Sequence, residues 1–141
     1  MLMLAGALIL PAPGASATAG RAARSLSVND TAQLKLVHQA GEDITEEGQA
    51  KGEVSGHVKL LLELGPTVVA RFTITAAGGS ISGLGSGRPK GRSAEPSFAG
   101  TMKVTHGTGL YSRAHGSGGF YGTLNRRTYK MVVQTTGTLD Y

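Results

Sequence analysis

VSGHVKLLLELGPTVVARFTITA, residues 54–76, is the stretch that decides the fold. Apolar and polar side chains alternate along both of its halves, which is typical of β-strands with one buried face. The side chains expected to point inward are Val54, Gly56, Val58, Leu60, Leu62, Val68, Ala70, Phe72, Ile74 and Ala76. Because Gly65-Pro66 between the halves is a turn signal, the stretch predicts a β-hairpin.

The same period-two pattern extends to both sides of this hairpin. Its further inward positions are Ala32, Leu34, Leu36, His38, Phe98, Gly100, Met102, Val104, His106, Tyr129, Met131, Val133 and Thr135. Two segments break the pattern: residues 40–51 predict an acidic loop, with at most one helical turn, and residues 85–95 a polar loop. Seven or eight sequential strands with short turns predict an all-β fold. A small antiparallel up-and-down β-barrel of about eight strands is favoured, and a sandwich is the alternative.

Composition agrees with this fold class and excludes several kinds of site. The chain has 141 residues, one domain's length, and its 22 glycines favour short strands and tight turns over helices. There is no cysteine, which excludes disulfides, a thiol nucleophile and a zinc–thiolate centre. The four histidines lack the spacing of metal ligands, so we expect neither a metal nor a cofactor.

Basic residues gather in the C-terminal half of the chain. Residues 21–87 hold six basic and seven acidic side chains, whereas residues 88–141 hold eight and two. A basic face built from Arg88, Lys90, Arg92, Arg126 and Arg127 would suit an anionic polymer, which is one functional hypothesis. Residues 86–92, SGRPKGR, are similar to an AT-hook core but lack its flanking arginine, so a solvated loop is favoured and no nucleic-acid partner is expected.

The N-terminus has the pattern of a secretory signal peptide. Leu2–Leu10 is an apolar run, and Ala15-Ser16-Ala17 and Ala17-Thr18-Ala19 both fit a signal-peptidase site. No basic residue precedes the run, and the alternative is an apolar strand or helix of the fold. We expect a signal peptide over residues 1–19, a flexible leader over 20–30, a barrel domain over 31–141, and a secreted, periplasmic or cell-surface protein without stable membrane insertion after cleavage.

The sharpest local motif is HGTGLYSRAHG, residues 106–116. It resembles the G-G-T-G-x-F-x-x-A-x-G corner of the allene oxide cyclase and dirigent barrel superfamily, with His106 in place of the first glycine and Tyr111 as the aromatic. GGSISGLG, residues 78–85, is similar to the glycine-rich hairpin that precedes a variable loop in these proteins. The resemblance covers residues 31–141, but its specific part is about a dozen residues.

The resemblance implies an eight-stranded barrel with a central cavity, often exported and assembled as a homo-oligomer. Family members include cyclases and proteins that steer radical coupling. Their catalytic residues lie outside the matching motif, so none is transferred to this chain. We therefore expect an exported barrel that binds a small apolar molecule. The alternative is a cyclase or coupling-steering enzyme acting on a small organic substrate in the cavity.

Polar side chains on the inward parity, or on the motif corner, are the candidate ligand-binding residues. These are His38, His106, Tyr111, Arg113 and Tyr129. Histidine, tyrosine and arginine at a barrel mouth could bind a small organic ligand and polarise an oxygen or move a proton. If the opposite parity faced the interior, Arg71, His57 and Glu63 would line the cavity instead.

Overall fold

The predicted hairpin is present in the computed structural model, which describes residues 24–91 and 95–141. Strand β3 (Gly56–Glu63) pairs antiparallel with β4 (Val68–Ala76), and Leu60 lies opposite Phe72. The other elements of the described chain are β1 (Ser25–Ala40), β2 (Asp43–Lys51), β5 (Gly79–Lys90), β6 (Ser97–Gly107), the one-turn 3-10 helix η1 (Gly109–Tyr111), β7 (His115–Leu124) and β8 (Met131–Asp140).

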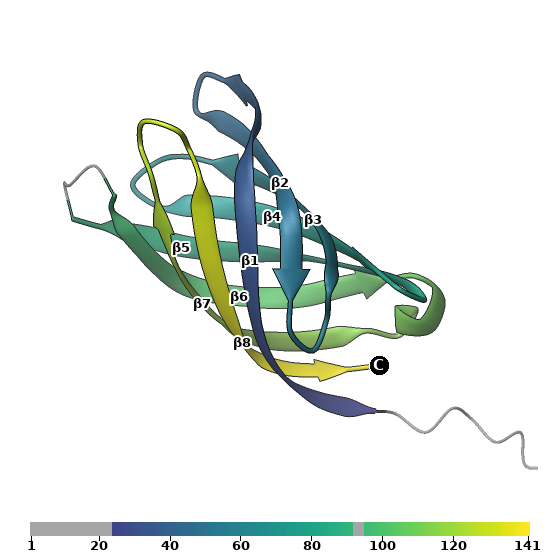
Figure 1. Ribbon diagram of the computed structural model, residues 1–141. Coiled ribbons are helices and arrows are strands. Elements are labelled where there is room, and N and C mark those ends of the chain that lie inside the picture. Colours follow the sequence, from purple (N-terminus) through teal and green to yellow (C-terminus); the bar gives the residue numbers. More distant parts are fainter. Residues whose placement is uncertain (1–23, 92–94) are drawn as a thin grey trace, which may run out of the picture.

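The eight strands close into a barrel (Figure 1). Each strand pairs antiparallel with the next, and β1 returns to pair with β8, with Ala32 opposite Val133. This confirms the prediction of an up-and-down β-barrel and excludes the sandwich. Closure also leaves no unpaired strand edge, which would otherwise be a site of aggregation.

The alternating strand directions define two ends. The β1–β2, β3–β4, β5–β6 and β7–β8 connections lie at one end, which we call the mouth. The remaining connections lie at the other end, which we call the closed end. Figure 1 shows η1 and the C-terminus together there. At this end Arg24 and Tyr141 exchange backbone hydrogen bonds of 2.7 and 2.9 Å, so the C-terminal residue is tied to the start of β1.

Three predicted boundaries differ from the structure. Residues 43–51 form β2 and not an acidic loop, because Ile44 and Ala50 point inward while most of the acidic side chains point outward. Strand β5 continues to Lys90, into the segment predicted as a loop, and β1 begins at Ser25, inside the predicted leader. The predicted signal peptide, residues 1–19, lies outside the described residues.

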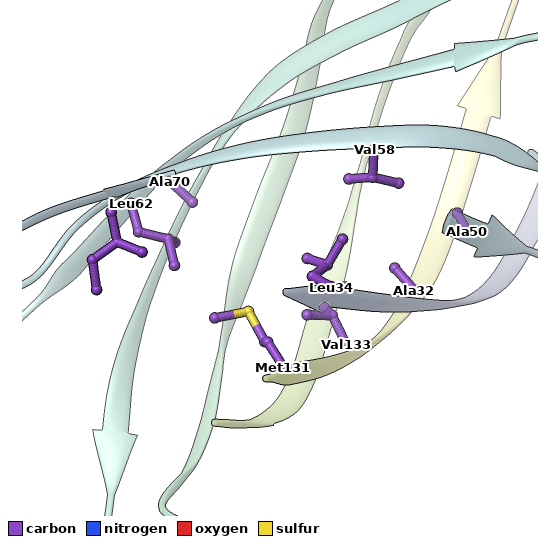
Figure 2. Packing of buried hydrophobic residues seen from close by; sticks show 9 residues of the cluster. Ala32, Leu34, Ala50, Val58, Leu62, Ala70, Met131 and Val133 are labelled. Carbon is purple, nitrogen blue, oxygen red and sulfur yellow. The ribbon is translucent and has the colours of Figure 1, made fainter. Parts of the chain in front are cut away.

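Two clusters of buried apolar side chains occupy the interior. The main cluster comes from β1–β4 and β8, and Figure 2 shows its side chains extending toward one common space. Its buried members are Ala32, Leu34, Ile44, Ala50, Val58, Leu62, Ala70, Met131 and Val133. The second cluster fills the closed end with Val54, Ile81, Val104, Tyr111, Ala114 and Leu139. The expected inward parity is therefore confirmed at these apolar positions, and strands β5–β7 contribute few of the buried side chains.

Candidate functional site

The barrel encloses a cavity of about 440 Å³. Its wall is almost entirely apolar and includes small side chains such as Ala32, Ala50 and Ala70 where larger ones would fill the space. The lining continues past the strand ends to Leu64 and Gly65 of the β3–β4 connection, so the cavity reaches the mouth. A cavity of this size is far larger than the small voids between close-packed core side chains.

Glycines shape the wall on the β5–β7 side. Phe72 lies over Gly83, and a Cβ atom built on Gly83 would be 2.6 Å from the ring's Cζ. Phe120 covers Gly87 in the same way, at 2.9 Å. Any larger residue at these glycines would push the rings into the cavity. The glycine excess therefore has a specific role here, which is to let aromatic rings lie close to the backbone and leave the centre open.

Two polar side chains of the cavity wall lie at the mouth. Arg126 and Tyr129, both in the β7–β8 connection, line the cavity. Asn125 holds this connection in shape, since its side-chain oxygen accepts hydrogen bonds from the backbone N–H groups of Arg127 and Thr128 at 2.9 and 3.1 Å. Tyr129 is the only described non-glycine residue with positive φ, at 57°. Such a conformation is costly for a bulky residue, so the connection fixes the ring at the mouth.

The closed end is sealed by aromatic rings. Tyr111, on η1, is buried and packs against Tyr141 with ring centroids 5.0 Å apart. Burial, with a smaller effect of Tyr141, raises the pKa of the Tyr111 hydroxyl. Ala114 packs in the same cluster, as the motif corner suggested. Tyr111 is therefore placed as a plug at the closed end and not on the cavity surface.

A second buried group at the closed end is Asp30 of β1. Its carboxylate accepts hydrogen bonds from the backbone N–H groups of Glu53 and Val54, at 2.5 and 3.1 Å. Burial raises the pKa of this carboxyl, and the two backbone hydrogen bonds partly oppose the shift. Asp30 lines the cavity, but its hydrogen bonds are used to hold the β2–β3 connection.

The two histidines predicted to point inward do not. The register of β1 against β2 shifts between Leu36 and His38, and that of β6 against β5 shifts near His106. Each shift inserts one residue and reverses the side-chain alternation beyond it. His38 and His106 are therefore exposed on the outside.

Of the remaining predicted ligand-binding residues, some line the cavity and others do not. Arg113 is exposed beside η1 and does not line the cavity. Of the five predicted ligand-binding residues, only Tyr129 lies on the cavity wall, and ligand binding by it stays a prediction. The opposite-parity alternative is wrong, because Arg71, His57 and Glu63 lie on the outer face; His57 Nε2 is 3.8 Å from Glu47 there.

Glu46 and Asp30 are buried carboxyl groups that the sequence did not predict, and Glu46 is the more deeply buried of the two. It points inward from β2, between Leu36 on β1 and Leu60 on β3, and is 0% exposed. Neither carboxylate oxygen has a hydrogen-bond partner among the described residues. Burial raises the pKa of this carboxyl to about 7. The available signal was the alternation Ile44, Glu46, Gly48, Ala50, which the acidic composition of the segment obscured.

Residues 24–91 and 95–141 contain no group of three or more potential metal-ligating side chains. Nor do they contain a helix long and apolar enough to cross a membrane. Comparison with protein-family models, with curated proteins and with solved structures finds no match to this sequence.

Proposed function

We propose that this barrel binds a small apolar molecule in its interior. The observation that carries the proposal is the cavity of about 440 Å³ with its apolar wall. Pockets for small ligands usually measure about 300–1,000 Å³ and are mainly apolar, with a few polar groups that orient the ligand. Arg126 and Tyr129 at the mouth are such polar groups.

The glycine-lined wall supports binding over a purely structural role. A core that served only stability would be expected to close over its side chains, because empty space forfeits van der Waals contacts. Here Gly83 and Gly87 draw Phe72 and Phe120 away from the centre. The sequence thus maintains the space at the expense of core packing.

A fluorescent apolar probe, N-phenyl-1-naphthylamine, tests the proposal. Its emission should rise on binding to the full-length mature protein. Val133→Phe, which adds a ring on the inner face, should weaken binding at least about tenfold, equivalent to about 1.4 kcal/mol. Val132→Phe is the matched control, because the side chain of Val132, the neighbouring residue, is 41% exposed on the outer face. No binding, or equal loss in both variants, would contradict the proposal.

Catalysis is the weaker alternative. An enzyme of the resembled superfamily would need polar groups that converge on the substrate. The polar wall residues with ionisable side chains lie at opposite ends, with Asp30 at the closed end and Arg126 and Tyr129 at the mouth. This separation favours orienting a ligand over transforming it.

Export forms part of the same proposal and rests on the residues preceding the barrel. The apolar run Leu2–Leu10 and the two small-residue cleavage patterns support it. Mass spectrometry of protein secreted by a bacterial host should find a mature chain beginning after Ala17 or Ala19. Retention of the intact chain in the cytoplasm would contradict export and leave the binding proposal unaffected.

A further inference from the structure

Glu46 is an interior carboxyl group whose polar atoms are left unpaired within residues 24–91 and 95–141. Glu46 is completely buried, and both of its side-chain oxygens lack a hydrogen bond among the described residues. Buried polar groups are almost always hydrogen-bonded, so each exception calls for an explanation. Asp30 makes the contrast clear, since that buried carboxylate is satisfied by two backbone N–H groups.

The position of Glu46 places it next to the cavity. It lies in register with Leu60 of β3, on the same inward face, and Leu60 lines the cavity. Side chains at such paired positions have Cβ atoms about 5 Å apart. Glu46 is therefore the direct cross-strand neighbour of a residue of the cavity wall.

We infer that Glu46 is the internal anchor for the ligand's own polar group, and that the ligand is a neutral, mainly apolar molecule with one hydroxyl or carbonyl. This inference deepens the proposed function and rests on it. A carboxylic acid offers one O–H donor and a carbonyl acceptor, which together match a hydroxyl or a carbonyl. A ligand hydroxyl can donate to one of the two Glu46 oxygens and accept from the O–H of the other, whereas a ligand carbonyl can accept from the O–H.

The charges of the cavity wall argue for a neutral ligand. Arg126 is the cationic residue of the described wall and lies at the mouth, where it opposes entry of an ammonium group. An anionic head group would be favoured by Arg126 but repelled by the carboxylate of Asp30, which also lines the cavity, and by an ionised Glu46. A hydroxyl or carbonyl on an apolar skeleton meets neither obstacle.

Three compounds that share one ring system separate the contributions of the apolar wall, of a hydroxyl group and of a positive charge to ligand affinity. Naphthalene reports binding to the apolar wall alone, 1-naphthalenemethanol adds a hydroxyl, and 1-naphthalenemethylamine adds a cation. Affinities for the full mature protein are measured by displacement of N-phenyl-1-naphthylamine at pH 6. We expect the alcohol to bind about tenfold more tightly than naphthalene, since a hydrogen bond to a buried partner gives roughly this factor. The amine should bind more weakly than the alcohol.

Two substitutions at Glu46 then test the anchor. Glu46→Leu should leave naphthalene binding unchanged and abolish the preference for the alcohol. Glu46→Gln, which keeps a donor and an acceptor, should retain most of that preference. Glu47→Gln, on the outer face of the same strand, is the matched control and should behave as the native protein.

The possible results distinguish this inference from the proposed function. Failure of naphthalene and of the fluorescent probe to bind would contradict the proposed function itself. Binding of naphthalene with no preference for the alcohol would overturn the inference and leave the proposed function standing. The same holds if the preference survives Glu46→Leu, or if the amine binds best. If Glu46→Leu does not fold, Glu46→Ala takes its place. An unaltered preference of Glu46→Ala for the alcohol over naphthalene would overturn the inference equally.

Discussion

The carboxylate of Asp30 accepts a hydrogen bond of 3.1 Å from the backbone N–H of Val54, across the closed end of the barrel. Its other oxygen accepts one from Glu53. Asp30 thus ties the β2–β3 connection to β1, where no strand ladder reaches it. Asp30→Ala would leave two backbone N–H groups without partners. We expect a loss of about 2 kcal/mol in the free energy of unfolding, measured by urea titration.

Asp140→Ala is the control for this substitution. The Asp140 carboxylate lies 3.5 Å from His115 on the surface, where ion pairs contribute less than about 1 kcal/mol. A similar loss of unfolding free energy in both variants would show that the hydrogen bonds of Asp30 do not stabilise the fold more than a surface ion pair does. Asp30→Asn should lose an intermediate amount of unfolding free energy, because the single side-chain oxygen of asparagine cannot replace both carboxylate oxygens as an acceptor.

The Tyr111 plug provides a second prediction about stability. Tyr111→Ala would remove a buried ring from the second cluster and its contact with Tyr141. We expect a loss of about 3 kcal/mol, the usual cost of truncating a buried aromatic residue. Tyr121→Ala should cost far less, because that ring is 53% exposed. Equal losses in the two thermal unfolding curves would contradict a sealing role for Tyr111.

Local sequence predicted the barrel but not the orientation of every side chain. Strand existence followed from alternation, which is strong where neighbours such as Phe72 and Ile74 share a buried face. His38 and His106 were misplaced because one bulged residue before each reverses the alternation, and a bulge depends on the partner strand. Tyr129 does line the cavity, but from the β7–β8 connection and with positive φ, and not as the strand residue that the alternation predicted.

Glu46 could not be found by local pattern for a related reason. The composition of residues 40–51 is acidic and indicates an exposed loop. Strand β2 is buried on its inner face because it pairs on either side with the apolar strands β1 and β3. The environment of Glu46 is thus set by long-range pairing with Leu36 and Leu60, and not by its sequence neighbours.

The glycine-lined wall makes a prediction about both stability and binding. Gly83→Ala would bring a methyl group within 2.6 Å of the Phe72 ring and close to a backbone oxygen of Lys103. We expect a loss of about 1–3 kcal/mol from overpacking, and weaker binding of the fluorescent probe as the ring moves inward. Gly119→Ala is the control, because its nearest neighbour would be the Gly100 oxygen at an ordinary 3.5 Å. Because the Lys103 oxygen is the nearer of the two contacts, the stability loss alone does not test the ring position, and unchanged probe binding in Gly83→Ala would contradict the proposed role of Gly83.

Glu46 also makes stability depend on pH in a direction that can be worked out. Burial raises the pKa of its carboxyl from 4.5 to about 7 in the folded protein. Below pH 4.5 the group is protonated in both states and has no effect. As the pH rises from 4.5 to 7, the unfolded chain loses this proton and the folded chain keeps it. The folded state is therefore penalised progressively, and the penalty is complete above pH 7, at about 3 kcal/mol.

Glu46→Gln should remove this dependence. Urea midpoints at pH 5 and pH 8 should differ less in Glu46→Gln than in the native protein, and the variant should be the more stable of the two at pH 8. Glu47→Gln is the control and should keep the native dependence, because its side chain faces outward beside His57. Burial also raises the pKa of the Asp30 carboxyl, and its effect on stability should be the same in all of these variants because each of them retains Asp30. An unchanged difference between pH 5 and pH 8 in Glu46→Gln would show that the buried carboxyl does not titrate in this range.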